Sequence, residues 1–294
     1  MKFMNMKDKN MKTPEKIFLC AICNIESGTC NEDCKFCTQS VKYKADIQRF
    51  KRKSIEEIIN EAKIAKANKA IGYCLVTAGA GLDDKRLEFV ASTAREVKKA
   101  VPDLNLIACN GLASKEQLQE LKKAGVDNYN HNLETSQDFY KQICTTHDWE
   151  ERYQTCLNVN SVGLHLITGG IFGMGETQED RLSMLNSIKD LKPKTTPLNF
   201  FHPNDALPIV KNTLTLEESF ALITTAREIL GDDVRVMVAG GREVTFKEKQ
   251  YDIFKYGANA MVIGNYLTTQ GKTASTDIDA IESLGLTIAK YCKK

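Results

Sequence analysis

The chain has 294 residues, of which 42% are hydrophobic and 27% charged, a composition typical of soluble globular proteins. Its 40 Lys and Arg nearly balance 38 Asp and Glu, and a formal net charge of +2 argues against nucleic acid as a partner. No apolar run approaches the roughly 20 residues that cross a bilayer, and the lysine-rich start lacks the apolar core of a secretory signal. We therefore expect a cytoplasmic protein without a membrane partner, in which clustered cysteines indicate metal or redox chemistry.

Short apolar or β-branched runs alternate with longer charged segments of helical period along the chain. The predicted strands are residues 17–25, 71–79, 104–111, 128–134, 163–173, 196–203, 234–241 and 260–265. The predicted helices are residues 54–69, 84–101, 114–125, 148–163, 177–192, 215–230 and 246–257. Several of these helices begin at a Ser, Thr or Asp cap and end near a Gly.

Eight strands separated by helices predict a (β/α)8 barrel of the TIM type. We expect it to form a single domain over residues 17–294, after a polar N-terminal tail at residues 1–16. A doubly wound open sheet is the alternative, but no G-x-G-x-x-G turn follows the first predicted strand. In a barrel the active site gathers where the strands end, so polar residues at those positions are candidate site residues.

A dense cysteine motif, "CNEDCKFC", follows the first predicted strand. Cys30, Cys34 and Cys37 form a C-x3-C-x2-C run. Three thiolates at this spacing hold three corners of a 4Fe–4S cluster and leave one iron open. A tetrahedral zinc site would need a fourth ligand, which Cys20 or Cys23 would supply. The spacing alone leaves both alternatives open.

With Phe36 before the last cysteine, the motif resembles that of the radical S-adenosylmethionine superfamily. The resemblance implies a 4Fe–4S cluster that binds S-adenosylmethionine and cleaves it to a radical that abstracts hydrogen from unactivated carbon. Further segments, "YNHNLETS", "GGIFGMGE", "PLNFF" and "AGGREV", are similar to the biotin synthase family, with similarity from about residue 17 to 270. That family implies sulfur insertion into dethiobiotin from an auxiliary Fe–S cluster, a flavodoxin- or ferredoxin-type low-potential electron donor, and a homodimer.

The same resemblance assigns roles to single residues. It implies that Cys30, Cys34 and Cys37 bind the S-adenosylmethionine cluster and that no side chain is itself the catalyst. It also implies that Asn132, Glu134 and Arg152 bind S-adenosylmethionine, Asn132 and Glu134 at its ribose and Arg152 at its methionine carboxylate. Asn130 and Asn199 match contacts to the ureido ring of the substrate. The chemistry agrees, because an amide reads a ureido group in both directions and a carboxylate accepts from ribose hydroxyls.

Plainer interpretations exist for several of these residues. An Asn at a strand end is often a turn former. His131 alternates with Asn130 and Asn132, so it is expected to face the other way as a packing residue. The glycines of "GGIFGMGE" indicate a close backbone approach near a cofactor rather than a nucleotide loop.

The auxiliary cluster is where the chain departs from the family pattern. The resemblance implies a 2Fe–2S cluster held by three cysteines and an arginine on inner strands. Cys74 and Cys109 match two of these positions, but Ile167 and Met237 occupy the other two. Arg235 lies two residues before Met237, on the same strand face but further along.

We therefore predict that Cys20, Cys74, Cys109 and Cys144 enclose a 4Fe–5S type of cluster, as in a similar branch of the family. Cys23 is a reserve candidate, although it should face opposite to Cys20. The alternative is that each thiol is an ordinary buried core residue. We expect Cys156 and Cys292 to be structural.

Two other functions fit parts of the pattern. One is another barrel-type radical enzyme, such as a hydrogenase maturase or a methylornithine-forming mutase. The other is a non-catalytic Fe–S or zinc-binding protein.

Overall fold

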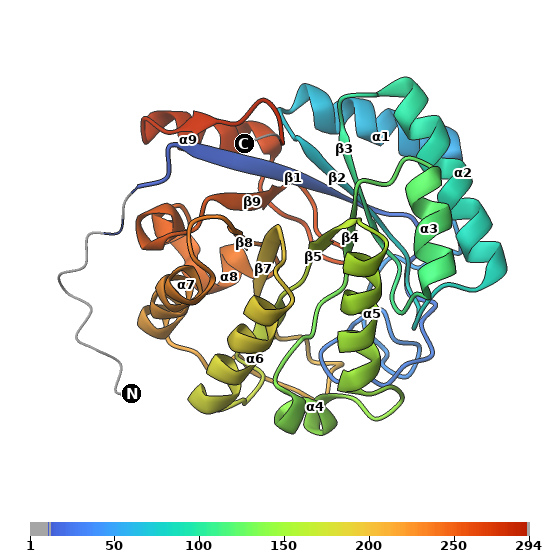
Figure 1. Cartoon of the computed structure of the whole chain (residues 1–294). Helices are drawn as coiled ribbons and strands as arrows, with labels where there is room; N and C mark the ends of the chain where they lie inside the picture. The colour runs from blue at the N-terminus through green and yellow to red at the C-terminus, as the bar shows by residue number, and fades with distance from the viewer. Residues whose placement is uncertain (1–10, 12, 293–294) are drawn as a thin grey trace.

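The computed structural model describes residue 11 and residues 13–292, and a closed barrel of parallel strands lies at its centre (Figure 1). Its strands are β1 (Lys16–Asn24), β2 (Gly72–Val76), β3 (Asn105–Cys109), β4 (Asn128–Asn130), β5 (His165–Ile167), β6 (Gly170–Phe172), β7 (Thr195–Phe200), β8 (Arg235–Val238) and β9 (Ala260–Ile263). They pair in chain order, except that β5 and β6 together fill one position beside β7, and β1 pairs with β9 to close the ring. The predicted (β/α)8 barrel is confirmed, while most of the predicted tail at residues 1–16 lies outside the described residues.

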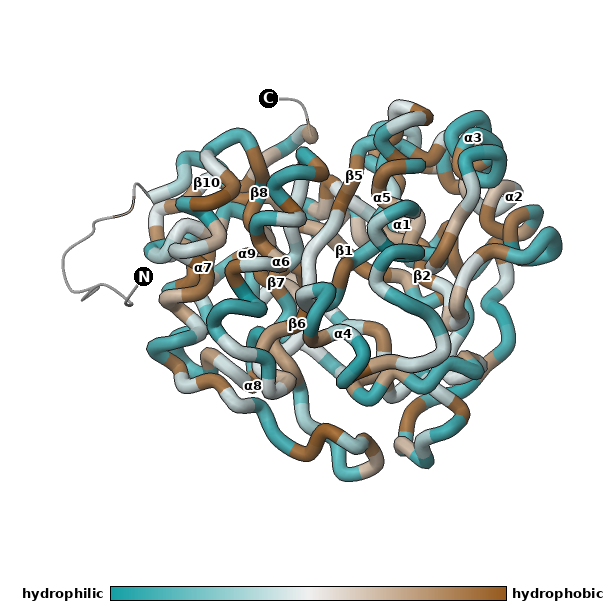
Figure 2. The backbone as a smooth tube through the Cα atoms, turned by 60° about the horizontal axis from the view of Figure 1, so that its bottom comes forward, coloured by the Kyte–Doolittle hydropathy of each residue, from teal (hydrophilic) through white to brown (hydrophobic). Residues whose placement is uncertain are grey.

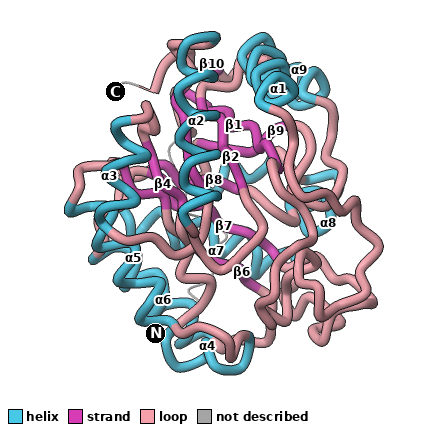
Figure 3. Tube along the Cα trace, turned by 90° about the vertical axis from the view of Figure 1, so that its right-hand side faces the viewer, coloured by secondary structure: helices cyan, strands magenta, loops and turns pink. Residues whose placement is uncertain are grey.

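Helices surround the strands on the outside (Figure 3). They are α1 (Ile55–Ala67), α2 (Asp84–Ala100), α3 (Lys115–Lys123), α4 (Gln137–Ile143), α5 (Trp149–Ser161), α6 (Gln178–Asp190), α7 (Leu216–Leu230), α8 (Arg242–Phe246) and α9 (Ala274–Ser283). A short strand, β10 (Thr287–Ile288), pairs with the start of β1. The helix predicted at residues 246–257 is wrong, because Lys247 adopts a φ of 48° that ends α8 and leaves two 3-10 turns, Lys247–Lys249 and Asp252–Tyr256.

Side-chain caps begin the helices that the sequence predicts. The capping side chains, each accepting from a backbone N–H in the first turn, are Ser54, Asp83, Ser114, Asp148, Thr177 and Thr215. All but Asp83 form a complete capping box. Each such cap contributes about 1 kcal/mol to helix stability, so the helix starts follow from local sequence.

Two hydrophobic cores lie on the two faces of the strands. Outward side chains such as Ile17, Leu19 and Cys23 pack with the helices, whereas inward side chains such as Cys20 and Cys74 pack inside the barrel. The outer helices carry both hydrophilic and hydrophobic stretches, as α2 shows in Figure 2. The strict alternation along β1 places Cys20 and Cys23 on opposite faces, as predicted.

A buried charged cluster after β8 supports the rim of the barrel. Arg242 is fully buried and donates to both carboxylate oxygens of Asp277 (3.1 Å each) and to Gln250 (2.5 Å). It also donates to Glu243 (3.0 Å), whose other oxygen accepts from the Tyr266 hydroxyl (2.9 Å). The preceding Gly241 is required because a Cβ there would lie 1.9 Å from the carbonyl oxygen of Phe200. The cluster therefore fixes the loop that carries Tyr266, which lines the barrel cavity.

We expect Arg242→Met to lower the free energy of unfolding by about 3–5 kcal/mol, because it leaves the buried Asp277 carboxylate without its cation. Urea denaturation followed by circular dichroism measures the change. The control is Lys255→Met, which removes an exposed ion pair with Asp252 and should cost less than about 1 kcal/mol. Equal losses in the two variants would contradict a supporting role for the buried cluster.

Candidate active site

The candidate site is a cavity of about 540 Å³ inside the barrel. Every strand contributes to its wall: Cys20 (β1), Cys74 (β2), Cys109 (β3), Asn130 (β4), Ile167 (β5), Ile171 (β6), Asn199 (β7), Met237 (β8) and Val262 (β9). Cys37, Asn132 and Glu134 line it from the loops beyond β1 and β4. A larger hollow of about 810 Å³ lies beside α2 and α3 and is lined by no cysteine. The barrel cavity is therefore the place where most of the predicted site residues meet, although Cys30, Cys34, Cys144 and Arg152 do not line it.

The loop that follows β1 holds the cysteine triplet in a fixed shape. The Cys37 backbone N–H donates to the Cys34 carbonyl (3.0 Å), and the Val41 N–H donates to the Cys30 carbonyl (2.8 Å). Burial raises the pKa of the Cys30 thiol and raises that of Cys37 to about 11. Bare thiolates are thus disfavoured in this loop, and a positively charged metal centre that displaces their protons fits the donor set.

Asp33 joins this loop to the segment after α4. Its carboxylate accepts from the backbone N–H groups of Thr145 (2.9 Å) and Thr146 (3.3 Å) and from both threonine hydroxyls. Burial raises the pKa of the Asp33 carboxyl, but the hydrogen bonds from Thr145 and its neighbours outweigh this, and the net shift is downward. The cluster loop is therefore bound to the opposite side of the barrel mouth.

Cys144 lies in this joined region and not in the barrel interior. Its Sγ is 3.7 Å from Cys34 Sγ, and neither residue lines the barrel cavity. The hydrogen bond between them lowers the pKa of Cys144 to about 4 and raises that of Cys34. The structure does not bring Cys144 together with Cys20, Cys74 and Cys109, because α4 carries it past the strand ends to the cluster loop.

The other three predicted auxiliary ligands do converge. Cys20, Cys74 and Cys109 come from three neighbouring strands and share the inner core. A hydrogen bond between Cys74 and Cys109 raises the pKa of Cys74 and lowers that of Cys109. Asn130 Nδ2 also donates to Cys109 Sγ (3.2 Å). The inner wall thus offers three thiols, and the neighbours of Cys109 lower its pKa.

The amides near these thiols have unused acceptors. Asn130 Oδ1 and Asn132 Oδ1 are buried without a hydrogen-bond partner among the described residues. An unpaired buried acceptor costs about 1–3 kcal/mol, so both oxygens favour a ligand that brings N–H or O–H donors. Asn199 is already engaged, since its Nδ2 donates to Gly170 (3.1 Å) and its Oδ1 accepts from Gly240 (2.9 Å). It keeps one hydrogen and one lone pair for a ligand.

Glu134 occupies a constrained position at the end of "YNHNLETS". Its φ of 69° lies in the left-handed region, where a residue with a side chain is strained. Backbone bonds to the Gly169–Ile171 segment hold this conformation, including Ile171 N–H to the Glu134 carbonyl (2.8 Å). Burial raises the pKa of its carboxyl. The fold therefore aims a desolvated carboxylate into the cavity.

Arg152 lies behind this wall and does not line the cavity. Its guanidinium donates to the Asn132 carbonyl (2.7 Å) and the Tyr140 hydroxyl (2.6 Å), and it lies 3.8 Å from Glu134. These bonds place it as a support for the segment of Asn132 and Glu134. The contact of Arg152 with the methionine carboxylate stays a prediction.

The remaining sequence candidates have structural partners. Cys23 donates to Glu61 (3.1 Å) on the outer face of β1, and Cys156 donates to the His131 carbonyl (3.3 Å). His131 is buried, and burial keeps its pKa well below the ordinary value, in agreement with a packing role. Arg235 donates to the Cys292 carbonyl (2.6 Å) and stacks on Phe18, so it does not replace Met237 in the cavity wall.

The glycines of "GGIFGMGE" allow close contacts within the backbone. A Cβ on Gly169 would lie 1.9 Å from the Pro197 carbonyl oxygen on β7. The Glu176 side chain accepts from the N–H groups of Gly173 (2.8 Å) and Met174 (2.7 Å). The close approach predicted from these glycines is therefore between strands.

Two residues beside Cys144 were missed by the sequence analysis. His147 Nδ1 lies 3.4 Å from Cys144 Sγ and 2.7 Å from a Glu32 carboxylate oxygen. The signal for His147 was the C-x2-H spacing of Cys144 and His147, a spacing typical of metal ligands. Glu32 has no local signal, because its contact joins segments that are far apart in sequence.

Comparison with known families and proteins agrees with this geometry. Residues 25–188 match the model of the radical SAM superfamily, and residues 197–287 match the biotin and thiamin synthesis associated domain. A biotin synthase of Aliarcobacter butzleri is 66% identical over 94% of this chain and 98% of its own length. Biotin synthases of Sulfurimonas denitrificans and Campylobacter jejuni are 56% and 55% identical, each over 99% of their length and 95% and 94% of this chain.

Solved structures share the fold at much lower identity. The FeFe-hydrogenase maturase of Carboxydothermus hydrogenoformans superposes with a TM-score of 0.80 at 15% identity, covering 95% of this chain and 70% of the maturase. A methylornithine synthase superposes with a TM-score of 0.78 at 16% identity, covering 94% of this chain and 84% of its own. These likenesses establish the barrel and nothing finer.

We expect Asp33→Asn to lower the free energy of unfolding by about 1 kcal/mol, because an amide is a weaker acceptor for the threonine N–H and O–H groups and the site is partly exposed. The folded-state pKa of Asp33 is depressed, so its stabilisation is present above the unfolded pKa and is lost as pH falls through the folded one. Thermal unfolding across an acid series measures this.

The control for that series is Asp103→Asn, at an exposed position in the loop after α2. Only the Asp33 variant should lose part of the acid dependence. A shared change in both variants would argue against the Asp33 bridge.

Proposed function

Because the chain belongs to the biotin synthase family of the radical SAM superfamily, it is a radical enzyme of biotin synthesis, and we propose which residues serve that reaction. The reaction is sulfur insertion into dethiobiotin, and electrons come from a low-potential donor. The observation that carries the proposal is the single cavity that joins Cys37 of the cluster loop to three thiols and two free amide acceptors.

Cys30, Cys34 and Cys37 would hold the 4Fe–4S cluster. Their burial and the raised pKa values of their thiols suit a metal centre that replaces thiol protons. When bound, this cluster and S-adenosylmethionine supply the one-electron chemistry that removes hydrogen from saturated carbon, and the auxiliary cluster supplies sulfur. The chain positions these groups and excludes water from the space between them.

Cys20, Cys74 and Cys109 would hold the auxiliary cluster. They are the three thiols of the inner wall, and the Cys109 sulfur already accepts a hydrogen bond from Asn130. Ile167 and Met237 line the same cavity and offer no strong ligand, so the thiols occupy one side of the barrel only. A larger cluster of the 4Fe–5S type, anchored from β1 to β3, is consistent with this one-sided donor set.

The polar groups between the two thiol sets would bind the organic molecules. Asn130, beside Cys109, would accept from the ureido ring of dethiobiotin, and Asn199 would give a second contact. Asn132 and Glu134 would take the ribose of S-adenosylmethionine, and Arg152 positions both through the Asn132 carbonyl and the Glu134 carboxylate. Substrate and radical source thus meet in one desolvated space.

The assembly and the compartment follow from the family alone. We expect a homodimer that acts in the cytoplasm. Light scattering of the purified chain measures its molar mass and so tests the dimer. No helix within the described residues has the length and apolar character needed to cross a membrane.

Iron counting tests the two thiol sets. After anaerobic reconstitution we expect about eight irons per chain, and about four in Cys74→Ala/Cys109→Ala, since each set holds a cluster of about four irons. Colorimetric iron analysis of the desalted protein measures this. Cys156→Ala and Cys144→Ala are the controls that keep the auxiliary iron. About four irons in the wild type, unchanged in the double variant, would remove the auxiliary cluster.

The pH dependence of S-adenosylmethionine binding tests Glu134. Since burial raises the pKa of Glu134, the carboxyl is protonated over a wider acid range and then lacks one acceptor site. Affinity should therefore rise as pH increases through that pKa, and Glu134→Gln should remove the rise and weaken binding about 10-fold. Equilibrium dialysis of the cluster-loaded enzyme measures both effects. Asp138→Asn, at an exposed site on α4, is the control, and an unchanged pH profile in Glu134→Gln would refute the assignment.

A further inference from the structure

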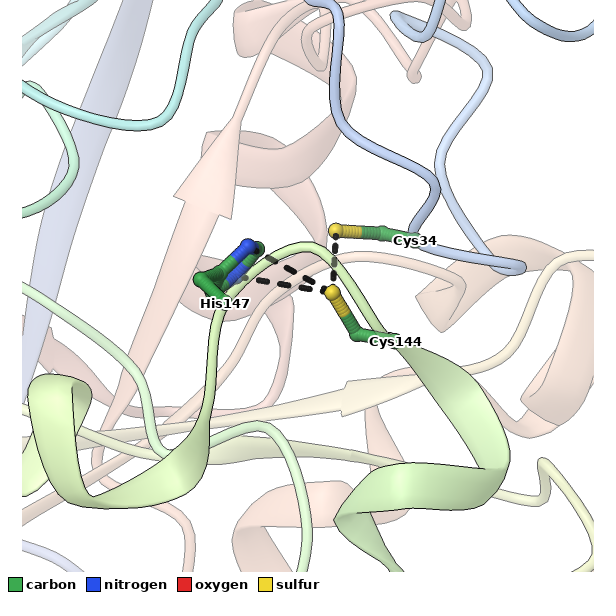
Figure 4. A group of neighbouring side chains, drawn as sticks. All are labelled: Cys34, Cys144 and His147. Atoms are coloured by element: carbon green, nitrogen blue, oxygen red, sulfur yellow. Dashed lines mark hydrogen bonds between the residues drawn. The ribbon is translucent and has the colours of Figure 1, made fainter.

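A second set of metal-binding side chains lies outside the barrel cavity. Cys34, Cys144 and His147 bring three ligand atoms within 4.8 Å of one another (Figure 4). Cys34 comes from the loop after β1, and the other two come from the segment between α4 and α5. Cys34 and Cys144 are 8% and 2% exposed, and the His147 side chain is 7% exposed. The three ligand atoms are therefore already close together and largely buried.

The spacing of these atoms is that of a tetrahedral ion. Metal–sulfur bonds of about 2.3 Å at tetrahedral angles separate two sulfurs by about 3.8 Å, and sulfur from a nitrogen ligand by about 3.6 Å. The observed Cys34–Cys144 Sγ separation is 3.7 Å. Cys144 Sγ lies 3.4 Å from His147 Nδ1 and 3.8 Å from Nε2. No large movement of the chain is needed to place an ion among them.

The surroundings of His147 match those of a histidine ligand. Nδ1 lies 2.7 Å from Glu32 Oε2, so a neutral ring that donates Nδ1–H to this carboxylate would present its Nε2 lone pair to an ion. Ligating histidines commonly donate their second N–H to such a carboxylate, which fixes the ring orientation. Arg152 Nη2, 3.3 Å from Nε2, is the group an ion would displace, and the guanidinium keeps its bonds to Tyr140 and Asn132.

We propose that Cys34, Cys144 and His147 bind one thiophilic divalent cation of the Zn²⁺ class in the chain that lacks its Fe–S cluster. Two thiolates and an imidazole neutralise the ion, their protons pass to solvent, and water takes the fourth position. Cys34 belongs to both sites, so the ion and the 4Fe–4S cluster exclude each other. That exclusion rests on the proposed function, whereas ion binding itself does not.

Spectroscopic titration with Co²⁺ tests the site. The full chain is freed of its cluster by chelation under anaerobic, reducing conditions and titrated with Co²⁺ alone. We expect one tetrahedral Co²⁺ with thiolate charge-transfer absorption, displaced by one equivalent of Zn²⁺. Cys144→Ala and His147→Ala should each weaken binding at least about 10-fold, since loss of even an outer partner costs about 10- to 100-fold.

The cluster cysteines supply the decisive control. Cys30→Ala/Cys37→Ala leaves the proposed ligands intact and should bind Co²⁺ within about threefold of the wild type. Loss of binding there, with full binding in Cys144→Ala, would place the ion on the C-x3-C-x2-C triplet and overturn the proposal. Cys156→Ala, another buried thiol, controls for general effects of thiol removal, and circular dichroism checks the fold of each variant.

Protection from alkylation tests the unaltered chain, without any substitution. Zn²⁺ should slow iodoacetamide labelling of Cys34 and Cys144, read by peptide mass spectrometry, and leave Cys30 and Cys37 unaffected. Equal protection of all four thiols would overturn the proposal. Cluster reconstitution, followed by its absorption, should be slower with one equivalent of Zn²⁺ in the wild type and not in Cys144→Ala. If ion binding holds and this slowing is absent, only the exclusion fails.

Discussion

Closure of the parallel barrel by pairing of β1 with β9 is the constraint on which the site depends. A closed sheet has one inside and one outside, and each strand sends alternate side chains to one or the other. Cys20, Cys74 and Cys109 fall on the inside because of their parity on β1, β2 and β3, whereas Cys23 falls outside and meets Glu61. Strand register and alternation thus determine which side chains face the barrel interior.

The rim of the barrel follows a different rule. Beyond the strand ends, positions are set by contacts between loops, and Asp33 is the main one, tying the cluster loop to Thr145 and Thr146. This bridge brings Cys144 to Cys34 and away from the interior thiols. The same segment carries Arg152 behind Asn132 and Glu134. One loop contact therefore organises the mouth of the cavity, and the walls below it are organised by the sheet.

This division explains what the sequence can predict. Strand order, the helix caps and the sides taken by Cys20 and Cys23 follow from period, capping residues and alternation, all of which are local. The resemblance of the motifs further predicts the family and singles out the residues of "YNHNLETS" as site residues. The position of Cys144 depends on a contact with Cys34, which lies 110 residues away in the sequence. The position of Arg152 depends on a bond to Asn132, 20 residues away, and no periodicity of the sequence predicts either contact. The end of α8 at Phe246 depends on Lys247, which adopts a left-handed conformation although it is not the glycine that usually marks such a position.

Ile167 and Met237, which stand where the family resemblance implies cluster ligands, line the cavity with apolar side chains. The thiols lie on β1 to β3, whereas Ile167, Pro197, Asn199 and Met237 line the cavity from β5, β7 and β8. Ile167, Pro197 and Met237 make much of this wall apolar, and an apolar wall keeps competing water away from Asn130 and Asn132. Hydrogen bonds made by those amides are then stronger, because the local dielectric is low. The barrel interior therefore carries its thiols on β1 to β3 and its amides and apolar side chains on the strands that follow.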